Sequence, residues 1–190
     1  ESVGSNNRSI YTFFTEDEDF KGSYGWFITN NNITDENGKL NFYTPDILID
    51  FFGKEKFSSD NAELREALKI FVRDYEASFR EYLKFTGSKL INSDIIFEKI
   101  LKVMLIYSIV GITCSDENIC YGLNYYSQDQ KVTLNYAIES MIEKSIVFKN
   151  PLNNLLEFKK SDALDINAAI AEYINNVENY DVNIIDEIEW

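Results

Sequence analysis

The stretch Ile-Val-Phe-Lys-Asn-Pro-Leu-Asn-Asn-Leu-Leu-Glu-Phe-Lys, residues 146–159, decides the predicted fold of the second half of the chain. Residues 146–149 and 155–159 are short runs rich in β-branched, aromatic and other apolar side chains. Between them, residues 150–154 supply the proline and asparagines that favour a tight turn. Two such runs around a turn sequence predict a β-hairpin.

Three helices are predicted before this hairpin. Residues 94–110 are strongly apolar, and a short helix follows Ser115, with Asp116 and Glu117 in its first turn near the positive end of the helix dipole. Residues 133–144 carry apolar side chains at helical spacing. Three helices followed by a two-stranded wing is the element order of a winged helix. A last helix is predicted over residues 165–177.

The first half of the chain is also predicted to be helical. Residues 60–85 form an amphipathic pattern, opened by a capping-box pair at Asp60 and Glu63 and stopped by Gly87. Shorter helices are expected at 8–14, at 24–28 and after Thr44, where Pro45 takes the first helical position. The predicted architecture is mainly α: a helical bundle over residues 1–90, a winged-helix-like domain with a C-terminal helix over 91–178, and an acidic tail over 179–190.

Charge limits the partners that this chain can attract. The 190 residues carry a net charge of -14, and the acidic excess lies mainly in residues 1–50 and 151–190. A negative field opposes non-specific binding to nucleic acid and to anionic lipid. The most apolar run, residues 103–114, is shorter than the ~20 residues that a membrane helix needs. These features predict a cytoplasmic protein with no membrane span.

No catalytic or metal-binding motif is visible. The chain contains no histidine, which rules out histidine-dependent triads, dyads and zinc sites within it. No glycine-rich phosphate-binding loop occurs. The only cysteines, Cys114 and Cys120, are expected to be buried or half-buried free thiols in a reducing compartment. We therefore predict no catalytic residue, no metal and no cofactor. An enzyme that uses carboxylates alone stays open as a hypothesis, and it requires a deep cleft lined by at least two converging Asp or Glu side chains.

Winged helices often bind DNA, so DNA binding is the alternative function. The third helix of the unit usually enters the major groove, and here it offers a mixture of charges: Lys131, Thr133, Asn135, Glu139, Glu143 and Lys144. The wing adds three lysines as candidate phosphate contacts: Lys149, Lys159 and Lys160. The acidic character of the whole chain argues against this function and favours a protein partner.

Several segments resemble one family. Residues 7–15, Asn-Arg-Ser-Ile-Tyr-Thr-Phe-Phe-Thr, with Phe20 after them, resemble the segment that follows the nucleotide-binding core of large bacterial P-loop ATPases, some of them linked to antiphage defence. Residues 100–106 resemble the helix that opens the winged-helix region of these proteins. Residues 138–147 and 160–166 resemble the end of that region. The matches follow the order of the family.

The resemblance implies that the chain is the helical and winged-helix portion downstream of an ATPase core. Any ATPase activity would then reside in the core, and this portion would transmit the nucleotide state or recruit a partner protein. Arg8 lies where an arginine from a lid could reach a nucleotide phosphate, although a surface or capping role is the alternative for a lone arginine. The chain begins with Glu1 rather than methionine, which predicts a piece of a longer protein.

Overall fold

The computed structural model describes residues 10–16, 18–34, 38–53, 65–86 and 92–160, all of which belong to one compact unit. Arg8, the predicted stop at Gly87, the predicted helix at 165–177 and the acidic tail lie outside the described residues. The predicted domain boundary at residues 90 and 91 stays a prediction for the same reason.

The long helix predicted over residues 60–85 begins only at Glu66, so the predicted start at the capping pair of Asp60 and Glu63 is wrong. Arg65 is not helical, and its carbonyl accepts hydrogen bonds from the N–H groups of Leu68 and Lys69 in the first turn.

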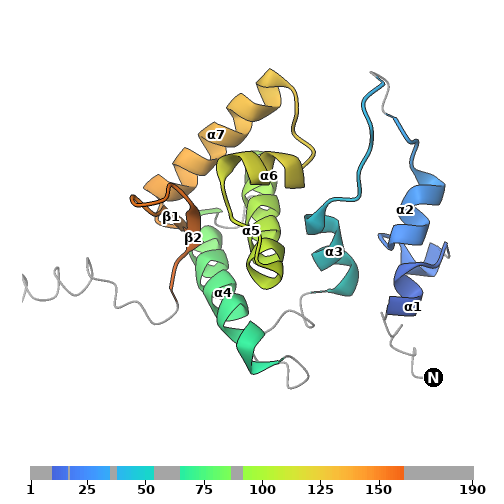
Figure 1. Cartoon of the computed structure of the whole chain (residues 1–190), viewed down its shortest axis with the longest axis horizontal. Helices are drawn as coiled ribbons and strands as arrows, with labels where there is room; N and C mark the ends of the chain where they lie inside the picture. The colour runs from blue at the N-terminus through green and yellow to red at the C-terminus, as the bar shows by residue number, and fades with distance from the viewer. Residues whose placement is uncertain (1–9, 17, 35–37, 54–64, 87–91, 161–190) are drawn as a thin grey trace, which may run out of the picture. The chain divides into compact units, whose positions relative to one another are not determined.

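The described residues are mainly helical, as predicted, with one small antiparallel hairpin (Figure 1). A 3-10 turn, η1 (Glu18–Phe20), lies between the first two helices. The seven helices are α1 (Ile10–Phe13), α2 (Tyr24–Asn30), α3 (Pro45–Phe52), α4 (Glu66–Thr86), α5 (Asn92–Val110), α6 (Asp116–Gly122) and α7 (Gln128–Glu143). The strands are β1 (Val147–Lys149) and β2 (Leu156–Phe158).

Serine side chains fix the starts of several helices. Ser115 caps α6, because its hydroxyl accepts a hydrogen bond from the backbone N–H of Asn118. Ser127 and Gln130 form a reciprocal capping box at the start of α7. The prediction that this helix starts at residue 133 is therefore wrong: it starts at Gln128, because the capping box satisfies the free N–H groups of a polar first turn.

Helix α5 is the centre of the fold and packs against α3, α4, α6 and α7 (Figure 1). Its side chains are buried on several faces, and Ile100, Leu101, Val103 and Leu105 are 0 % exposed. A helix that is apolar nearly all round is typical of a core position. Gly111, with φ of +76°, ends the helix, so the apolar run at 103–114 is only partly helical. None of the described helices combines the length and apolar character that crossing a bilayer requires.

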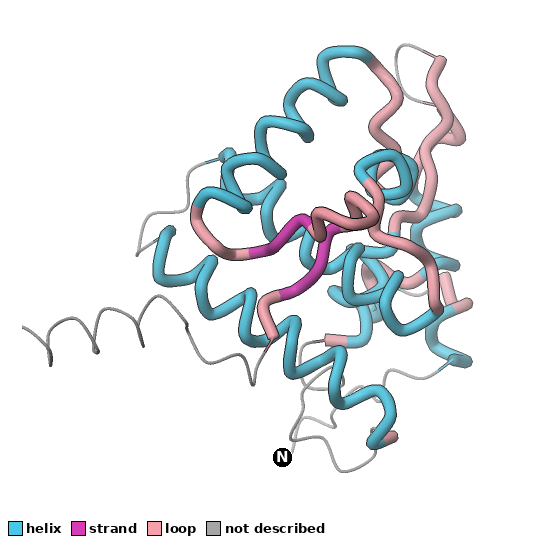
Figure 2. The backbone as a smooth tube through the Cα atoms, turned by 60° about the vertical axis from the view of Figure 1, so that its left-hand side comes forward, coloured by secondary structure: helices cyan, strands magenta, loops and turns pink. Residues whose placement is uncertain are grey.

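The predicted hairpin is confirmed. β1 and β2 are antiparallel, with Phe148 opposite Glu157, and they pack beside α7 and α4 (Figure 2). On the side away from β1, the backbone N–H of Leu156 donates to the carbonyl of Cys114, in the segment between α5 and α6, at 2.9 Å. Just past β2, the N–H of Lys159 donates to Ser78 Oγ on α4 at 2.8 Å. The hairpin is thus bonded to two other parts of the fold.

An aromatic cluster joins α1, α2 and α3. The ring of Phe13 on α1 lies 5.6 Å from that of Phe51 and 5.9 Å from that of Phe52, both on α3. At the start of α2, Ser23 Oγ donates to the carbonyl of Thr15 at 2.8 Å. Gly25 follows in the same turn and is buried directly against the backbone of residues 14 and 15. This close approach positions α2 against the end of α1.

Candidate functional site

The three wing lysines proposed as phosphate contacts all lie beside carboxylates. Lys149 Nζ is 2.7 Å from Asp116 Oδ2 on α6. Lys159 Nζ is 3.2 Å from Glu81 Oε1 on α4, and the carboxylate of Glu81 also accepts from Lys84. Lys160 Nζ is 3.9 Å from Asp74 Oδ2. Each carboxylate reduces the positive potential that a phosphate would meet at its lysine. For the stability of the fold, partly exposed ion pairs of this kind contribute only about 0–1 kcal/mol.

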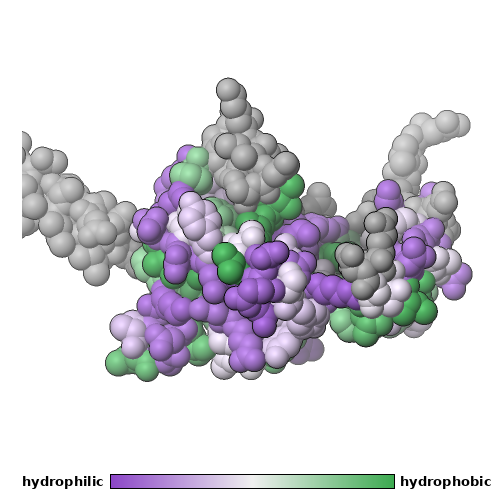
Figure 3. All heavy atoms as spheres, turned by 90° about the horizontal axis from the view of Figure 1, so that it is seen from above, coloured by the Kyte–Doolittle hydropathy of each residue, from purple (hydrophilic) through white to green (hydrophobic). Residues whose placement is uncertain are grey.

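Helix α7 presents a mixed surface. Lys131, Thr133 and Asn135 are exposed, as a helix that enters a DNA groove would require. The other exposed charges of the helix are acidic, namely Asp129, Glu139 and Glu143. Two apolar side chains one turn apart, Val132 and Tyr136, are 58 % and 74 % exposed. Figure 3 shows the molecule from above the view of Figure 1, and this face is mainly hydrophilic, with apolar groups in separate patches.

Lys144, which the sequence offered as a groove contact, is directed toward the fold. Its ammonium lies 4.2 Å from the centre of the Phe85 ring and 5.8 Å from that of Phe97, and it donates a hydrogen bond to Ser140 Oγ. Cation–π contact of this kind favours an ammonium at a half-buried position. Lys144 therefore helps to pack α7 against α4 and α5.

An open pocket lies between α6 and α7, with a volume of about 230 Å³. Its walls combine three tyrosines with carboxylates, a thiol, an amine and an amide: Tyr121, Tyr125, Tyr126, Asp116, Glu117, Cys120, Lys131 and Asn135. The centres of the Tyr121 and Tyr126 rings are 5.8 Å apart, at an angle of 53°. Tyr121 Oη donates to Glu117 Oε1 at 3.3 Å. We treat this pocket, with the adjoining face of α7, as the candidate functional site.

The loop after α6 positions the pocket's tyrosines. Asn124 adopts a left-handed backbone, with φ of +59°, which reverses the chain between Tyr121 and Tyr126. Lys39 holds this turn, since its ammonium donates to the carbonyl of Asn124 at 2.6 Å and to Gln130 Oε1 at 3.1 Å. The same ammonium lies 5.2 Å from the centre of the Tyr126 ring. A residue distant in sequence thus fixes one wall of the pocket.

Both cysteines are buried free thiols, as predicted. Burial raises the pKa of Cys114 to about 11. Burial also raises the pKa of Cys120, and Lys131 opposes part of this shift. The nucleophilic form of cysteine is the thiolate. At neutral pH both side chains therefore persist as thiols.

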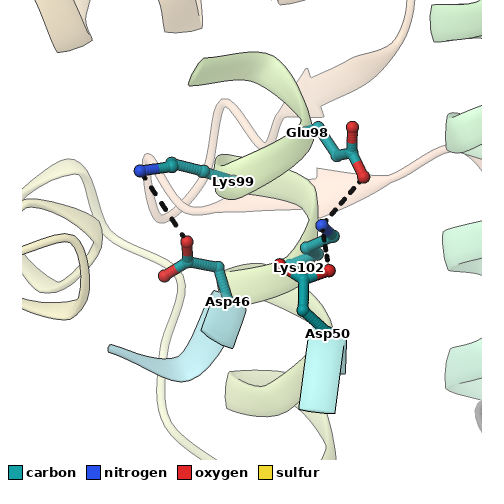
Figure 4. Close-up of polar contacts among 5 residues, drawn as sticks. All are labelled: Asp46, Asp50, Glu98, Lys99 and Lys102. Atoms are coloured by element: carbon teal, nitrogen blue, oxygen red, sulfur yellow. Dashed lines mark hydrogen bonds and ion pairs between the residues drawn. The ribbon is translucent and has the colours of Figure 1, made fainter. Parts of the chain in front are cut away.

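Carboxylates also converge on two lysines between α3 and α5 (Figure 4). Lys102, whose side chain is 7 % exposed, donates to Asp50 Oδ1 at 2.6 Å and to Glu98 Oε1 at 2.8 Å. Burial alone would lower the pKa of Lys102, but its hydrogen bonds to the two carboxylates outweigh burial and raise it. Lys99 Nζ lies 4.0 Å from Asp46 Oδ2. These carboxylates are bound to lysines, and the cluster joins α3 to α5.

Sequence reasoning missed the pocket. Arg8, the nucleotide-contact candidate, lies outside the described residues. The described residues contain no group of three or more Cys, Asp or Glu placed to hold a metal ion. The available signal for the pocket was the sequence of residues 116–126, in which two carboxylates precede three tyrosines in a short helix and loop. Lys131 and Asn135 line the same pocket only because α7 packs against α6, which the sequence alone does not show.

Comparison with known protein families, with curated proteins and with solved structures found no match to this chain.

Proposed function

We propose that this chain is a non-catalytic regulatory or protein-interaction region of a larger bacterial P-loop NTPase, and that residues 92–160 form its winged-helix-like unit. The order of α5, α6, α7 and the hairpin supports the winged-helix assignment.

The observation that carries the protein-interaction role is the surface of α7. It exposes Val132 and Tyr136 beside three carboxylates and one lysine, Lys131. A DNA-reading helix needs a positive field around it. An exposed tyrosine beside an aliphatic side chain is instead typical of the centre of a protein interface. The carboxylates beside Lys149, Lys159 and Lys160 also lower the positive potential of the wing, which argues against DNA binding.

The link to an NTPase rests on the resemblance of residues 7–15, 100–106, 138–147 and 160–166 to the region downstream of the ATPase core. In this proposal nucleotide hydrolysis belongs to the core, and this chain carries the nucleotide state to a partner in the cytoplasm. Arg8 is the candidate contact to the nucleotide. The complete gene should encode a P-loop upstream of Glu1, and a complete reading frame without one would overturn the NTPase assignment.

A co-purification experiment tests the interaction role directly. The upstream NTPase core and this chain are expressed as separate polypeptides, with an affinity tag on the core only. We expect the chain to co-purify with the core, and Val132→Glu with Tyr136→Glu to abolish that association. Ile70→Glu, which makes the same kind of change at an exposed apolar position of α4, is the matched control and should retain it.

Anisotropy titration with a labelled DNA duplex at low salt tests the alternative. Protein interaction predicts no salt-sensitive binding. Binding that weakens steeply with salt, and that Lys149→Gln and Lys159→Gln reduce, would replace this proposal with a DNA-binding winged helix.

A further inference from the structure

We propose that the pocket between α6 and α7 binds one basic side chain of the partner protein, an arginine guanidinium above all. The inference rests on the proposed protein-interaction function and specifies the chemistry that the interface recognises. The pocket holds about 230 Å³. Pockets for drug-sized ligands and cofactors typically hold about 300–1,000 Å³. The smaller volume suits a single side chain.

The tyrosines supply the first part of the recognition. Tyr121 and Tyr126 meet at 53° with ring centres 5.8 Å apart, and Tyr121 is 55 % exposed. A tyrosine face attracts a cation within about 6 Å of the ring centre, and arginine adds planar stacking. The ammonium of Lys39 already lies 5.2 Å from the centre of the Tyr126 ring. The aromatic wall of the pocket therefore already holds one cation of the chain itself.

The carboxylates supply the second part. Glu117 is exposed, and the hydroxyl of Tyr121 orients its Oε1. Asp116 Oδ2 binds Lys149, whereas Asp116 Oδ1 is buried and accepts no hydrogen bond from any described residue. A guanidinium has five N–H donors and can donate to Glu117 while its plane rests on a tyrosine.

Lys131 distinguishes a cationic ligand from an anionic one. It is the only cationic side chain among the pocket's lining residues, which also include two carboxylates. An anionic ligand would depend on Lys131 and would be repelled by Glu117. A cationic ligand would be opposed by Lys131, whose exposed amine can turn toward solvent. Removing this one charge therefore has opposite effects on the two classes of ligand.

The test uses the full chain and a defined probe, N-acetyl-arginine amide, titrated while the backbone amide signals of residues 116–136 are followed by NMR. N-acetyl-citrulline amide, which is neutral and nearly the same shape, is the matched ligand. We expect saturable shifts around the pocket with a dissociation constant on the order of 1–10 mM, the affinity of a single small contact, and weaker binding of citrulline.

Variants then assign the contacts. Tyr121→Ala and Glu117→Gln should each weaken arginine binding by about 2- to 5-fold, and Lys131→Met should tighten it. Glu66→Gln, which removes an exposed charge on α4 from outside the pocket lining, should leave it unchanged. Equal binding of citrulline, no saturable shift, or weaker binding after Lys131→Met would each overturn the proposal. If arginine binding fails these tests while Val132→Glu with Tyr136→Glu still abolishes co-purification, the pocket is rejected and the proposed interface stays intact.

Discussion

Replacing Gly25 with alanine tests how closely α2 approaches the end of α1. A Cβ at this position would lie 2.3 Å from the carbonyl oxygen of Thr15 and 2.4 Å from that of Phe14. An ordinary van der Waals contact begins near 3.4 Å, so the backbones would have to separate by about 1 Å. Both neighbours are backbone atoms, which cannot turn aside as a flexible side chain can.

The expected change in stability combines two costs and one gain. Overpacking that forces a backbone shift costs about 1–3 kcal/mol. The shift also weakens the hydrogen bond from Ser23 Oγ to Thr15, which contributes about 0.5–1.5 kcal/mol. Alanine in place of glycine in a helix returns at most about 1 kcal/mol. We therefore expect Gly25→Ala to lower the free energy of unfolding of the α1–α2 region by about 1–3 kcal/mol.

Urea unfolding followed by the fluorescence of Trp26, on α2, measures this effect. The chain has two tryptophans, so Trp190→Phe makes Trp26 the sole reporter. With a slope of about 1–3 kcal/mol per M, the transition midpoint should fall by about 1 M. Ile28→Ala, at an exposed position of the same helix, should change the free energy by only about 0.5 kcal/mol. An unchanged or higher midpoint for Gly25→Ala would show that helix propensity dominates and that α2 is not held as described.

Three further changes test the core, the polar cluster and the buried thiol. Leu134 on α7 is 0 % exposed, so Leu134→Ala should lower the free energy of unfolding, measured in urea, by about 2–5 kcal/mol. A decrease as small as that at an exposed position would contradict the packing of α7. Lys102→Met should cost about 1–3 kcal/mol, because Asp50 loses its buried partner while staying partly hydrated; the double variant with Asp50→Asn should lose less than the sum of the two single changes. Burial raises the pKa of Cys114 from 9.0 to about 11 in the folded chain. As pH rises from about 9 to about 11, the unfolded chain releases this proton while the folded chain keeps it, so the free energy of unfolding falls. Urea unfolding should therefore show that the difference in free energy of unfolding between the natural chain and Cys114→Ala narrows across that pH range. A difference that stays constant with pH would argue against a buried thiol.

Local sequence rules were sufficient for the hairpin and the central helix. The turn chemistry of residues 150–154 is local: Asn150 Oδ1 accepts from the N–H of Leu152, and Asn153 Oδ1 accepts from that of Leu155. The apolar character of α5 likewise follows from its own residues. The start of α7 was recognisable from Ser127 and Gln130, but the apolar periodicity begins later and directed the prediction to residue 133.

The candidate site was beyond local rules, because its geometry depends on distant pairs. Lys159 meets Glu81, and Lys39 meets Asn124. No periodicity links such positions, so the sequence showed the wing lysines as free cations. The tyrosines of the pocket were visible only as loop aromatics, since their arrangement depends on the left-handed turn at Asn124.

The bond from Leu156 to Cys114 also bears on self-association. A two-stranded hairpin ordinarily presents two open edges, and open edges are templates on which further strands of other chains can grow into aggregates. In this fold β2 has β1 along one edge and the carbonyl of Cys114 on the other. An added strand would first have to displace the segment between α5 and α6. The hairpin is therefore protected on its β2 side against ordered fibril growth while its tip stays open to solvent.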